Sequence, residues 1–487
     1  MSVDASGSPF GSDESARKSY LDERRSQWNS VALGNGAGSL SGNYRAWLQR
    51  IYGFLVPPGL RVCEVGCGGG DLLAALKPSF GLGLDFSPAM LDKARRLHPE
   101  LTWAECDAHD LSVALQAGPF DVVILSDLVN DLWDVQKVLS EVKRLCAPHT
   151  RVIFNFHSHL WEWPLRLAQK LGLASLRLEQ SWLTPSDLRG MLELADLEQV
   201  RLMDGFLWPL GTPLLEPLLN RCLAYLWPFN ALTLCHVLIC RPKACAQPPL
   251  KVSVIIPARN EAGNIEAAVA RTPQMGSGTE LVFVEGNSTD DTWETIQRVV
   301  ASHPELECRA YQQPGKGKGD AVRVGFAKAT GDVLMILDAD LTVPPEVLPV
   351  FYEAIRSGKA EFVNGVRLVY PQDKKAMRFC NLLANKFFSL AFTWLLGVTI
   401  KDTLCGTKVL SRESYARIAA NRHYFGEFDP FGDYDLLFGA ARLNLKVVDV
   451  PVRYKERTYG DTNISRWRDG WLLLRMVAFA ARRIKFL

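Results

Sequence analysis

Short apolar runs rich in β-branched residues alternate with amphipathic stretches along most of the chain. The runs include residues 60–65, 120–126, 252–256, 281–285 and 334–337. Apolar strands that alternate with helical stretches are typical of parallel sheets covered by helices. The pattern therefore predicts the α/β fold class in both halves of the chain.

A connector divides the two halves. Residues 241–250 read Arg-Pro-Lys-Ala-Cys-Ala-Gln-Pro-Pro-Leu, with three prolines and little periodicity. We expect a largely disordered tail over residues 1–30, a first domain over 31–243, a linker over 244–250 and a second domain over 251–487. No internal repeat is evident.

Composition narrows the classes of protein that remain. The 487 residues exceed one ordinary domain, and 48% hydrophobic with 22% charged residues is a globular composition. A formal net charge of +2 implies no long basic face, so we expect no nucleic-acid partner. Eleven cysteines without a Cys-x-x-Cys pair favour reduced thiols in a cytoplasmic protein. Residues 1–30 are polar and lack the apolar run of a signal peptide.

Three segments bear on membrane contact. The apolar run 387–400 lies between Lys386 and Lys401 and is shorter than the ~20 residues of a spanning helix. Residues 222–240 are uncharged, and each of these two runs suits a buried segment or a helix on the bilayer surface. Residues 471–487 interleave apolar and aromatic residues with four cations, as an interfacial anchor or an ordinary solvated helix does. We expect a peripheral protein on the cytoplasmic face of a membrane.

The run 334–337 ends in two carboxylates, Asp338 and Asp340, one residue apart. Both can project from the carboxyl end of a strand into a cleft. Two hard oxygen ligands suit Mg²⁺ or Mn²⁺, which completes its shell with water and substrate phosphates. The pair thus indicates a metal site that activates a diphosphate leaving group, and the alternative is a turn that uses Asp for local hydrogen bonds.

In the first half, a glycine-rich turn follows the run 60–65. The turn reads Gly66-Cys-Gly-Gly-Gly70, and a helix is expected from Asp71. Glycines let the backbone approach a ligand at the helix N-terminus. Asp85 ends the next strand, where an acidic side chain typically binds a ribose diol. A nicotinamide cofactor would give much the same signal.

The wider series of motifs separates these alternatives. It comprises Glu64-Val-Gly-Cys-Gly-Gly-Gly70, Asp85-Phe-Ser-Pro-Ala-Met-Leu, Glu105-Cys-Asp107 and Phe120-Asp-Val-Val-Ile-Leu-Ser-Asp127. Residues 45–242 thereby resemble the class I S-adenosylmethionine-dependent methyltransferases. The resemblance implies S-adenosyl-L-methionine as cofactor, its amino-acid end held near Glu64, Gly66 and Gly68. It also implies that Asp85 binds the ribose and that Asp107 faces the adenine.

The methyl acceptor is left open. The sequence Ser126-Asp-Leu-Val129 stands where enzymes that methylate base amino groups have Asn-Pro-Pro-Tyr, so carbon, oxygen and some nitrogen acceptors remain. His157 and His159 are candidates for a general base or for ordinary polar residues at a strand end. Residues 146–150 also lack the glycine that the family has before its fifth strand.

Four ordered motifs mark the second half. They are Pro257-Ala-Arg-Asn-Glu261, Glu285-Gly-Asn-Ser-Thr-Asp290, Gly315-Lys-Gly-Lys-Gly319 and Asp338-Ala-Asp340. Residues 251–487 thereby resemble family 2 glycosyltransferases of the GT-A fold, so we expect two Rossmann-like domains. The resemblance implies a nucleotide-sugar site and a metal held by Asp338 and Asp340. The expected nucleotide-sugar-binding residues are Pro257, Glu261, Glu285, Asp290, Lys316 and Asp338. Relatives often have Asp-Asp-Gly-Ser-x-Asp in place of residues 285–290, which leaves the base open.

Further downstream, an ordered set of residues resembles the dolichyl- and polyprenyl-phosphate sugar synthases. The set comprises Arg367, Arg378, Asn381, Asp402, Cys405-Gly-Thr-Lys408, Asp433 and Arg457-Thr-Tyr-Gly460. A lipid phosphate is already anionic and needs arginines, here Arg367, Arg378 and Arg457. A hydroxyl acceptor needs a base, for which Asp433 and Asp435 are candidates. Residues 462–466 depart from the Ser-Lys of the family.

These observations combine into one hypothesis, a bifunctional transferase. Its second domain would be a hexosyltransferase that uses a nucleotide-diphosphate sugar and a polyprenyl phosphate or another lipid-linked acceptor. Its first domain would methylate an unknown acceptor. The alternatives are a glycosyltransferase for a surface polysaccharide or a soluble acceptor, with a methyltransferase-like domain that only binds cofactor or docks partners, and a structural scaffold.

Overall fold

The computed structural model describes residues 14–34, 41–171, 178–370, 379–424, 432–457, 459 and 466–486. Two units divide between Lys243 and Ala244, inside the proline-containing connector. The first unit comprises Met1–Lys243 with Lys485–Leu487, and the second comprises Ala244–Ile484.

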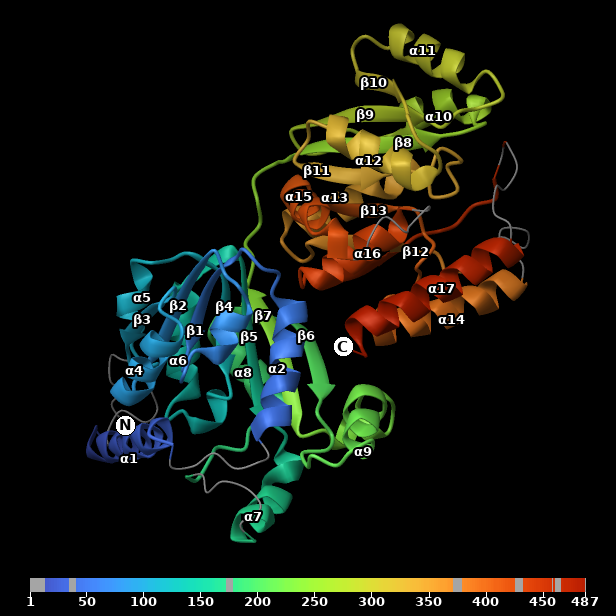
Figure 1. Ribbon diagram of the computed structural model, residues 1–487. Coiled ribbons are helices and arrows are strands. Elements are labelled where there is room, and N and C mark those ends of the chain that lie inside the picture. Colours follow the sequence, from blue (N-terminus) through green and yellow to red (C-terminus); the bar gives the residue numbers. More distant parts are fainter. Residues whose placement is uncertain are drawn as a thin grey trace. The chain divides into compact units, whose positions relative to one another are not determined.

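The first unit is built on a sheet of seven strands in the order β3-β2-β1-β4-β5-β7-β6 (Figure 1). All neighbouring strands pair in parallel except β7, which is antiparallel to both β5 and β6. The strands are β1 Arg61–Val65, β2 Phe80–Asp85, β3 Thr102–Glu105, β4 Phe120–Ser126, β5 Cys146–His157, β6 Leu197–Gly205 and β7 Cys235–Pro242. The central strands are almost wholly buried, which explains their continuous apolar sequences.

Helices of the first unit begin at capping residues that the sequence supplies. Ser87 caps α4 by accepting the amide of Met90, and Thr184 with Asp187 forms a capping box on α8. The helices are α1 Glu14–Ala32, α2 Ser41–Leu55, α3 Asp71–Ala75, α4 Pro88–Leu97, α5 Ser112–Leu115, α6 Val135–Arg144, α7 Glu162–Lys170, α8 Pro185–Leu194 and the short α9 Leu215–Pro217.

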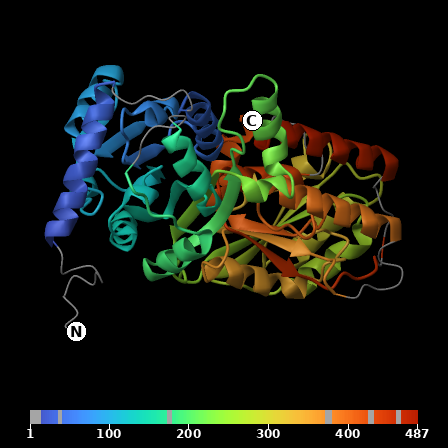
Figure 2. The same ribbon diagram turned by 90° about the horizontal axis from the view of Figure 1, so that it is seen from below.

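The expectation of a largely disordered tail over residues 1–30 is wrong for residues 14–30, which form most of helix α1. Helix α1 lies beside α4 (Figures 1 and 2). Polar contacts hold it: Arg25 Nε donates to Phe86 O over 3.1 Å, and Ser87 Oγ donates to Asn29 Oδ1 over 2.6 Å. The helix docks through polar groups and carries no apolar stripe. Its hydrophobic pattern therefore did not predict a helix.

The second unit is built on a sheet in the order β10-β9-β8-β11-β13-β12-β14. Strands β10, β9, β8 and β11 pair in parallel, β13 is antiparallel to β11 and β12, and β12 is parallel to β14. The strands are β8 Lys251–Ala258, β9 Gly278–Glu285, β10 Glu307–Gln312, β11 Val333–Ile336, β12 Phe362–Val366, β13 Lys408–Ser411 and β14 Val447–Pro451. Both units therefore confirm the predicted α/β class.

Helices pack on this sheet around a core that includes Val254, Phe283, Met335 and Val409. The helices are α10 Ile265–Arg271, α11 Thr292–Ser302, α12 Lys318–Lys328, α13 Leu348–Arg356, α14 Phe379–Leu396, α15 Arg412–Ala420, α16 Asp433–Arg442 and α17 Arg466–Ile484. Helices α14 and α17 lie side by side (Figure 1).

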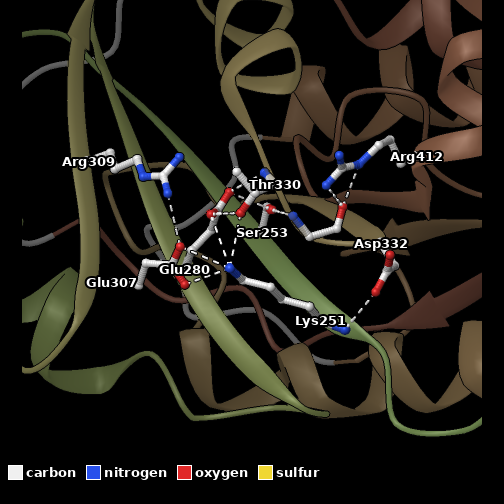
Figure 3. Close-up of polar contacts among 9 residues, drawn as sticks. Lys251, Ser253, Glu280, Glu307, Arg309, Thr330, Asp332 and Arg412 are labelled. Atoms are coloured by element: carbon white, nitrogen blue, oxygen red, sulfur yellow. Dashed lines mark hydrogen bonds and ion pairs between the residues drawn. The ribbon is translucent and has the colours of Figure 1, made fainter.

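The buried carboxylate of Glu280 links the segments at the amino ends of strands β8, β9 and β11 (Figure 3). Glu280 accepts hydrogen bonds from Ser253 Oγ at 2.8 Å and from the amide of Thr330 at 2.7 Å. Lys251 Nζ lies 3.9 Å from Glu280 Oε2, and Arg412 donates to Gly331 O. Burial raises the pKa of Glu280, but its hydrogen bonds outweigh burial and hold the pKa below its ordinary value. This network stabilises the edge of the sheet opposite to Asp338.

Candidate functional sites

At the carboxyl edge of the second sheet, a carboxylate meets a lysine. Asp338 follows β11, and Lys318 is the first residue of α12. Lys318 Nζ lies 2.6 Å from Asp338 Oδ1. Burial raises the pKa of Asp338, but the ammonium of Lys318 and the nearby Arg367 and Lys408 hold it below its ordinary value. Asp338 is therefore an anion in a cationic surrounding.

Two glycines make this convergence possible. A Cβ at Gly406 would collide with the side chains of Asp338 and Lys318, so the loop before β13 passes directly over the pair. Gly432 has φ +77°, and a Cβ there would lie 2.7 Å from the Cα of Gly319. The N-termini of α16 and α12 thus approach one another beside Asp338, where helix N-termini favour an anion.

Arg457 joins two carboxylates from distant parts of the sequence. Its Nη2 lies 2.6 Å from Asp340 Oδ2, and its Nη1 lies 3.3 Å from Glu261 Oε1. Asp340 also accepts from the amide of Thr342 at 3.1 Å and from its hydroxyl at 2.8 Å. Burial raises the pKa of Glu261 to about 7, while the hydrogen bond from Asn264 and the charge of Arg457 oppose the rise. Glu261 therefore titrates near neutral pH.

Asp433 lies in the same charged region, at the start of α16. Its side chain is buried, and its Oδ1 has no hydrogen-bond partner among the described residues. Burial raises the pKa of Asp433, although Lys318 and Lys408 oppose the rise. A buried acceptor without a donor is costly, which makes Asp433 a candidate for contact with substrate.

The structure separates the other expected catalytic residues. Asp435 accepts from Arg422 Nε at 2.7 Å, and lies about 200° around α16 from Asp433. Arg367 makes two side-chain bonds to the buried Asp402, of 2.7 and 2.9 Å, so its guanidinium is already engaged beside Asp338. Arg378 lies outside the described residues.

The expected nucleoside-binding residues surround the end of β8. Pro257 and Glu285 lie at the carboxyl ends of the paired strands β8 and β9. Asp290 accepts from the hydroxyl of Thr292 at 2.5 Å, and the same hydroxyl accepts the amide of Glu261 at 2.9 Å. Lys316 is exposed on the turn before α12, two residues from Lys318. Of these two lysines, Lys318 is the one that reaches Asp338, a difference that the spacing alone did not predict.

Asp338 and Asp340 have the donor chemistry for a divalent metal. Mg²⁺ commonly takes one or two carboxylates and fills its shell with water and phosphate oxygens. Within the described ranges, no group of three or more His, Cys, Asp or Glu side chains is arranged to hold a metal. The pair therefore has suitable donors for a divalent metal, and Lys318 and Arg457 contact the same two carboxylates.

In the first unit, Asp85 organises the glycine-rich turn. Its Oδ2 accepts the amide of Gly68 at 2.8 Å, and its Oδ1 accepts the amide of Ser87 at 2.9 Å. Gly68 has φ +52°, and a Cβ there would meet no atom within 4 Å, so the turn faces open space. Gly66 has φ +74° and lies against Leu128, since a Cβ there would be 2.9 Å from Leu128 Cδ1. The turn is therefore open to a ligand on the Gly68 side.

Two further carboxylates flank this turn. Glu64 is buried, its Oε2 has no partner among the described residues, and burial raises its pKa to about 8. Asp107 accepts from His109 Nδ1 at 2.7 Å and from Arg17 Nη2 at 2.9 Å. Burial raises the pKa of Asp107, but His109 and Arg17 outweigh burial and lower it. Arg17 belongs to α1, so the helix that the sequence did not predict touches the carboxylate expected at the adenine.

The two candidate histidines differ in their surroundings. His157 is buried at the end of β5, and its amide donates to Asn130 Oδ1 over 3.1 Å. His159 is exposed, with Nε2 at 4.0 Å from Glu162. His157 thus lies near the glycine-rich edge of the sheet, whereas His159 faces solvent.

Comparison with protein families agrees with this division. Residues 62–149 match the family model described as a methyltransferase domain, and residues 253–418 match the one described as glycosyl transferase family 2. The chain therefore carries a methyltransferase domain followed by a family 2 glycosyltransferase domain. The predicted class I methyltransferase and GT-A folds are confirmed.

Two of the relatives have names that combine a lipid phosphate with a sugar transferase. The chain is 32% identical over 220 residues to the dolichol-phosphate mannosyltransferase of Pyrococcus furiosus. The matched region covers 44% of this chain and 59% of the relative. The chain is also 27% identical over 226 residues to the undecaprenyl-phosphate 4-deoxy-4-formamido-L-arabinose transferase of Klebsiella pneumoniae, which covers 45% of this chain and 65% of the relative. The chain thus spans less than two thirds of the length of each relative.

Solved structures resemble each domain more distantly. Glucosyl-3-phosphoglycerate synthase from Mycobacterium tuberculosis has 20% identity and a TM-score of 0.36, over 48% of this chain and 80% of that one. Magnesium protoporphyrin IX methyltransferase from Synechocystis has 19% identity and a TM-score of 0.28, over 48% of this chain and 89% of that one. At these values the two similarities support no assignment of activity.

Proposed function

We propose that the protein is a bifunctional transferase. Its second domain transfers a sugar from a nucleotide-diphosphate sugar to a polyprenyl phosphate, and its first domain transfers a methyl group from S-adenosyl-L-methionine to an acceptor. The observation that carries the glycosyltransferase proposal is the alternation of charges at one sheet edge, where Lys318 pairs with Asp338 and Arg457 pairs with Asp340.

These residues suit the departure of a nucleoside diphosphate. Asp338 and Asp340 would hold Mg²⁺ or Mn²⁺, which neutralises charge on the diphosphate. Lys318 and Arg457 lie on the same two carboxylates and add positive charge where the leaving group gains negative charge. Glu261, Glu285 and Asp290 surround the adjoining end of β8 and suit contacts with the nucleoside.

A phosphate acceptor needs no general base for glycosyl transfer, which agrees with the few side chains at this site that are suited to act as one. A lipid phosphate is anionic at neutral pH, so its oxygen attacks without first losing a proton. Asp435 is paired with Arg422, which weakens it as a base, so Asp433, whose pKa burial raises, is the one carboxylate of the two that is suited to accept a proton. The names of the two relatives include dolichol phosphate and undecaprenyl phosphate, and thus support the same acceptor class. A hydroxyl acceptor that uses Asp433 as base is the second candidate.

The helix pair α14 and α17 supports contact with a membrane. On α14, Leu383, Phe387 and Leu390 are exposed and lie on one face. On α17, Trp471 is 65% exposed and shares a face with the exposed Arg475 and Arg482. Apolar and aromatic side chains beside cations are typical of helices that lie in the bilayer interface. None of the helices described is long and apolar enough to cross a bilayer.

The methyltransferase proposal depends on the open glycine-rich turn. Gly68 faces open space, and the Asp85 carboxylate accepts the amide of Gly68 and so fixes the turn. S-adenosyl-L-methionine would supply an electrophilic methyl group when bound there. The alternative, a domain that only binds the cofactor, predicts binding without transfer of the methyl group.

Titration calorimetry on the full chain tests the glycosyltransferase site. We expect nucleoside diphosphates to bind in the presence of Mn²⁺, and Asp340→Ala to abolish the Mn²⁺-dependent part of the affinity. Asp332→Asn is the matched control, because Asp332 lies at the opposite edge of the same sheet. Equal affinities for Asp340→Ala and the native protein would contradict the proposed site.

A further inference from the structure

A second polar cluster lies at the carboxyl edge of the first sheet. Tyr44 of α2 donates to Asp127 Oδ1 over 2.7 Å, and Asn155 Nδ2 donates to the same oxygen over 2.5 Å. Tyr52, also from α2, donates to Asn155 Oδ1 over 2.8 Å and so fixes the orientation of the amide. Cys235 Sγ lies 3.5 Å from the Tyr44 hydroxyl. The cluster joins α2 to the ends of β4, β5 and β7.

The cluster holds one carboxylate in an unusual position. Asp127 directly follows β4 and has φ 52°, which is uncommon for a residue other than glycine and frequent at functional sites. Both hydrogen bonds recorded for its carboxylate in the described chain end on Oδ1, so Oδ2 keeps its capacity to accept. Burial, and next the charge of Asp127, raise the pKa of Tyr44 well above its ordinary range, so Tyr44 stays a donor.

Asp127 lies next to the proposed cofactor site. Leu128, its neighbour in the chain, packs against Gly66, where a Cβ would be 2.9 Å from Leu128 Cδ1. His157 lies close to the same cluster, since its ring centroid is 6.1 Å from that of Tyr44. Asp127 thus follows directly on β4, and the next residue in the chain packs against the glycine-rich turn.

Two apolar segments leave the sheet from the rim of this cluster. His157 and Cys235 are register partners at the ends of β5 and β7. The chain runs from His157 into α7, and residues 206–234 lead back into Cys235. Trp161 Nε1 donates to Leu232 O over 2.8 Å and ties the two segments together. Both segments thus begin within a few residues of the Asp127 cluster.

These segments expose an unusual amount of apolar surface. Helix α7 has no buried residue, and its Trp163 is 76% exposed, with the exposed Leu167 one turn further on. In the other segment Leu214 is 88% exposed and Trp227 is 85% exposed. Exposed apolar groups on two segments that leave the sheet at a polar site indicate a partner that covers them. A molecule with an apolar chain and a polar head would cover this surface and reach Asp127 at once.

We propose that the first domain methylates a hydroxyl group on an amphiphile, with Asp127 as the general base and the apolar rim around Trp163 and Trp227 as the site of its chain. This inference rests on the proposed methyltransferase function. The acceptor oxygen forms a bond to the methyl carbon while the carbon–sulfur bond breaks. The bonding electron pair remains on sulfur, and the hydroxyl proton passes to Asp127 Oδ2. Tyr44 and Asn155 act as positioning residues through Oδ1.

The arrangement favours a hydroxyl over an amine. The oxygen of a hydroxyl becomes a good nucleophile only as its proton leaves, so it needs a base in the transition state, whereas an alkylammonium loses its proton to solvent before it attacks and needs no base in that step. Asp127 has one oxygen held by two donors, which leaves the other oxygen to accept a proton.

The test uses the full chain with tritiated S-adenosyl-L-methionine and two probes that share an apolar chain, decyl β-D-glucoside and decylamine. We expect tritium to enter decyl glucoside, and Asp127→Asn to lower kcat by about 100-fold or more. The Kd for S-adenosyl-L-methionine should stay within about twofold, because Asn tolerates a positive φ and keeps Oδ1. Asp92→Asn, an exposed change on α4, is the matched control.

Two further measurements separate the roles. Trp163→Ser and Trp227→Ser should each raise KM for decyl glucoside and leave kcat unchanged. Tyr44→Phe should lower kcat and shift its pH profile, which a purely structural contact would not do. Native activity in Asp127→Asn, methylation of decylamine in place of decyl glucoside, or no transfer to decyl glucoside by a protein that binds S-adenosyl-L-methionine would each overturn the inference. Failure to bind S-adenosyl-L-methionine at all would instead contradict the proposed function.

Discussion

Replacement of Asp85 by Asn should weaken S-adenosyl-L-methionine binding without unfolding the protein. In the native structure the carboxylate accepts the amide of Gly68 at 2.8 Å and the amide of Ser87 at 2.9 Å. Asn has one acceptor oxygen in place of two and carries no charge. One of the two amides therefore loses its acceptor, and the ribose loses a charged partner.

The size of the effect follows from the charged hydrogen bond to the ribose that the Asn side chain cannot make. A hydrogen bond to a charged group contributes about 1.5–3 kcal/mol. Because every 1.4 kcal/mol is tenfold in affinity, the Kd for S-adenosyl-L-methionine should rise between about 10-fold and about 150-fold. Asp85 is buried, so little of this energy is lost to screening by solvent.

Titration calorimetry with S-adenosyl-L-methionine and with NADH measures this prediction. Asp71→Asn is a matched control, since Asp71 lies at the first position of α3 and its side chain is 52% exposed. The control variant should bind S-adenosyl-L-methionine with the Kd of the native protein. NADH should bind neither the native protein nor the control variant. An unchanged Kd in Asp85→Asn, or tight binding of NADH by the native protein, would refute the reasoning.

Four other predictions concern the second domain. Asp340→Ala should lower glycosyl transfer by about 100-fold or more, because several kcal/mol of charge stabilisation at the leaving group is lost, and should leave the Kd for S-adenosyl-L-methionine unchanged. Burial raises the pKa of Glu261 from 4.5 to about 7, so affinity for nucleoside diphosphates should fall as pH rises through about 7, and calorimetry on Glu261→Gln should show a flatter profile. The same raised pKa gives stability that is present below 4.5 and lost as pH rises through about 7, so the stability of Glu261→Gln should depend less on pH. Arg475→Gln and Arg482→Gln should each weaken sedimentation with anionic vesicles about fivefold, from ~1 kcal/mol per charge, and an equal loss with neutral vesicles would contradict an electrostatic contribution.

The fold could be predicted from local sequence because buried parallel strands are continuous apolar runs. Residues 60–65, 120–126 and 334–337 each became a strand in the expected place, and the proline-containing connector lies at the division between units. Helix α1 could not be predicted in this way. Its docking depends on Arg17, Arg25 and Asn29, whose partners lie far away in the sequence.

The sites show the same limit. The motifs predicted Asp338, Asp340, Glu261 and Arg457 as site residues. Only the folded chain shows that Arg457 bridges Asp340 and Glu261. Local spacing cannot reveal a contact between residues 196 positions apart.

Pairs close in sequence were also separated by geometry. Asp433 and Asp435 differ by two positions on a helix, so they point about 200° apart and only Asp433 faces Lys318. The Tyr44–Asp127 bond spans 83 positions, and no sequence motif links the two residues. Helical direction and tertiary partners, rather than residue type, decide which acidic residues can act.

Transfer of labelled sugar into lipid shows whether the second domain glycosylates a polyprenyl phosphate. The full chain is incubated with Mn²⁺, anionic vesicles that contain undecaprenyl phosphate, and carbon-14-labelled nucleotide sugars one at a time, and the organic extract is counted. We expect one nucleotide sugar to label the lipid, Asp340→Ala to abolish the label, and Asp332→Asn to retain it. Label that never enters the lipid although a nucleoside diphosphate binds, or label that enters equally with Asp340→Ala, would contradict transfer to a polyprenyl phosphate at this site.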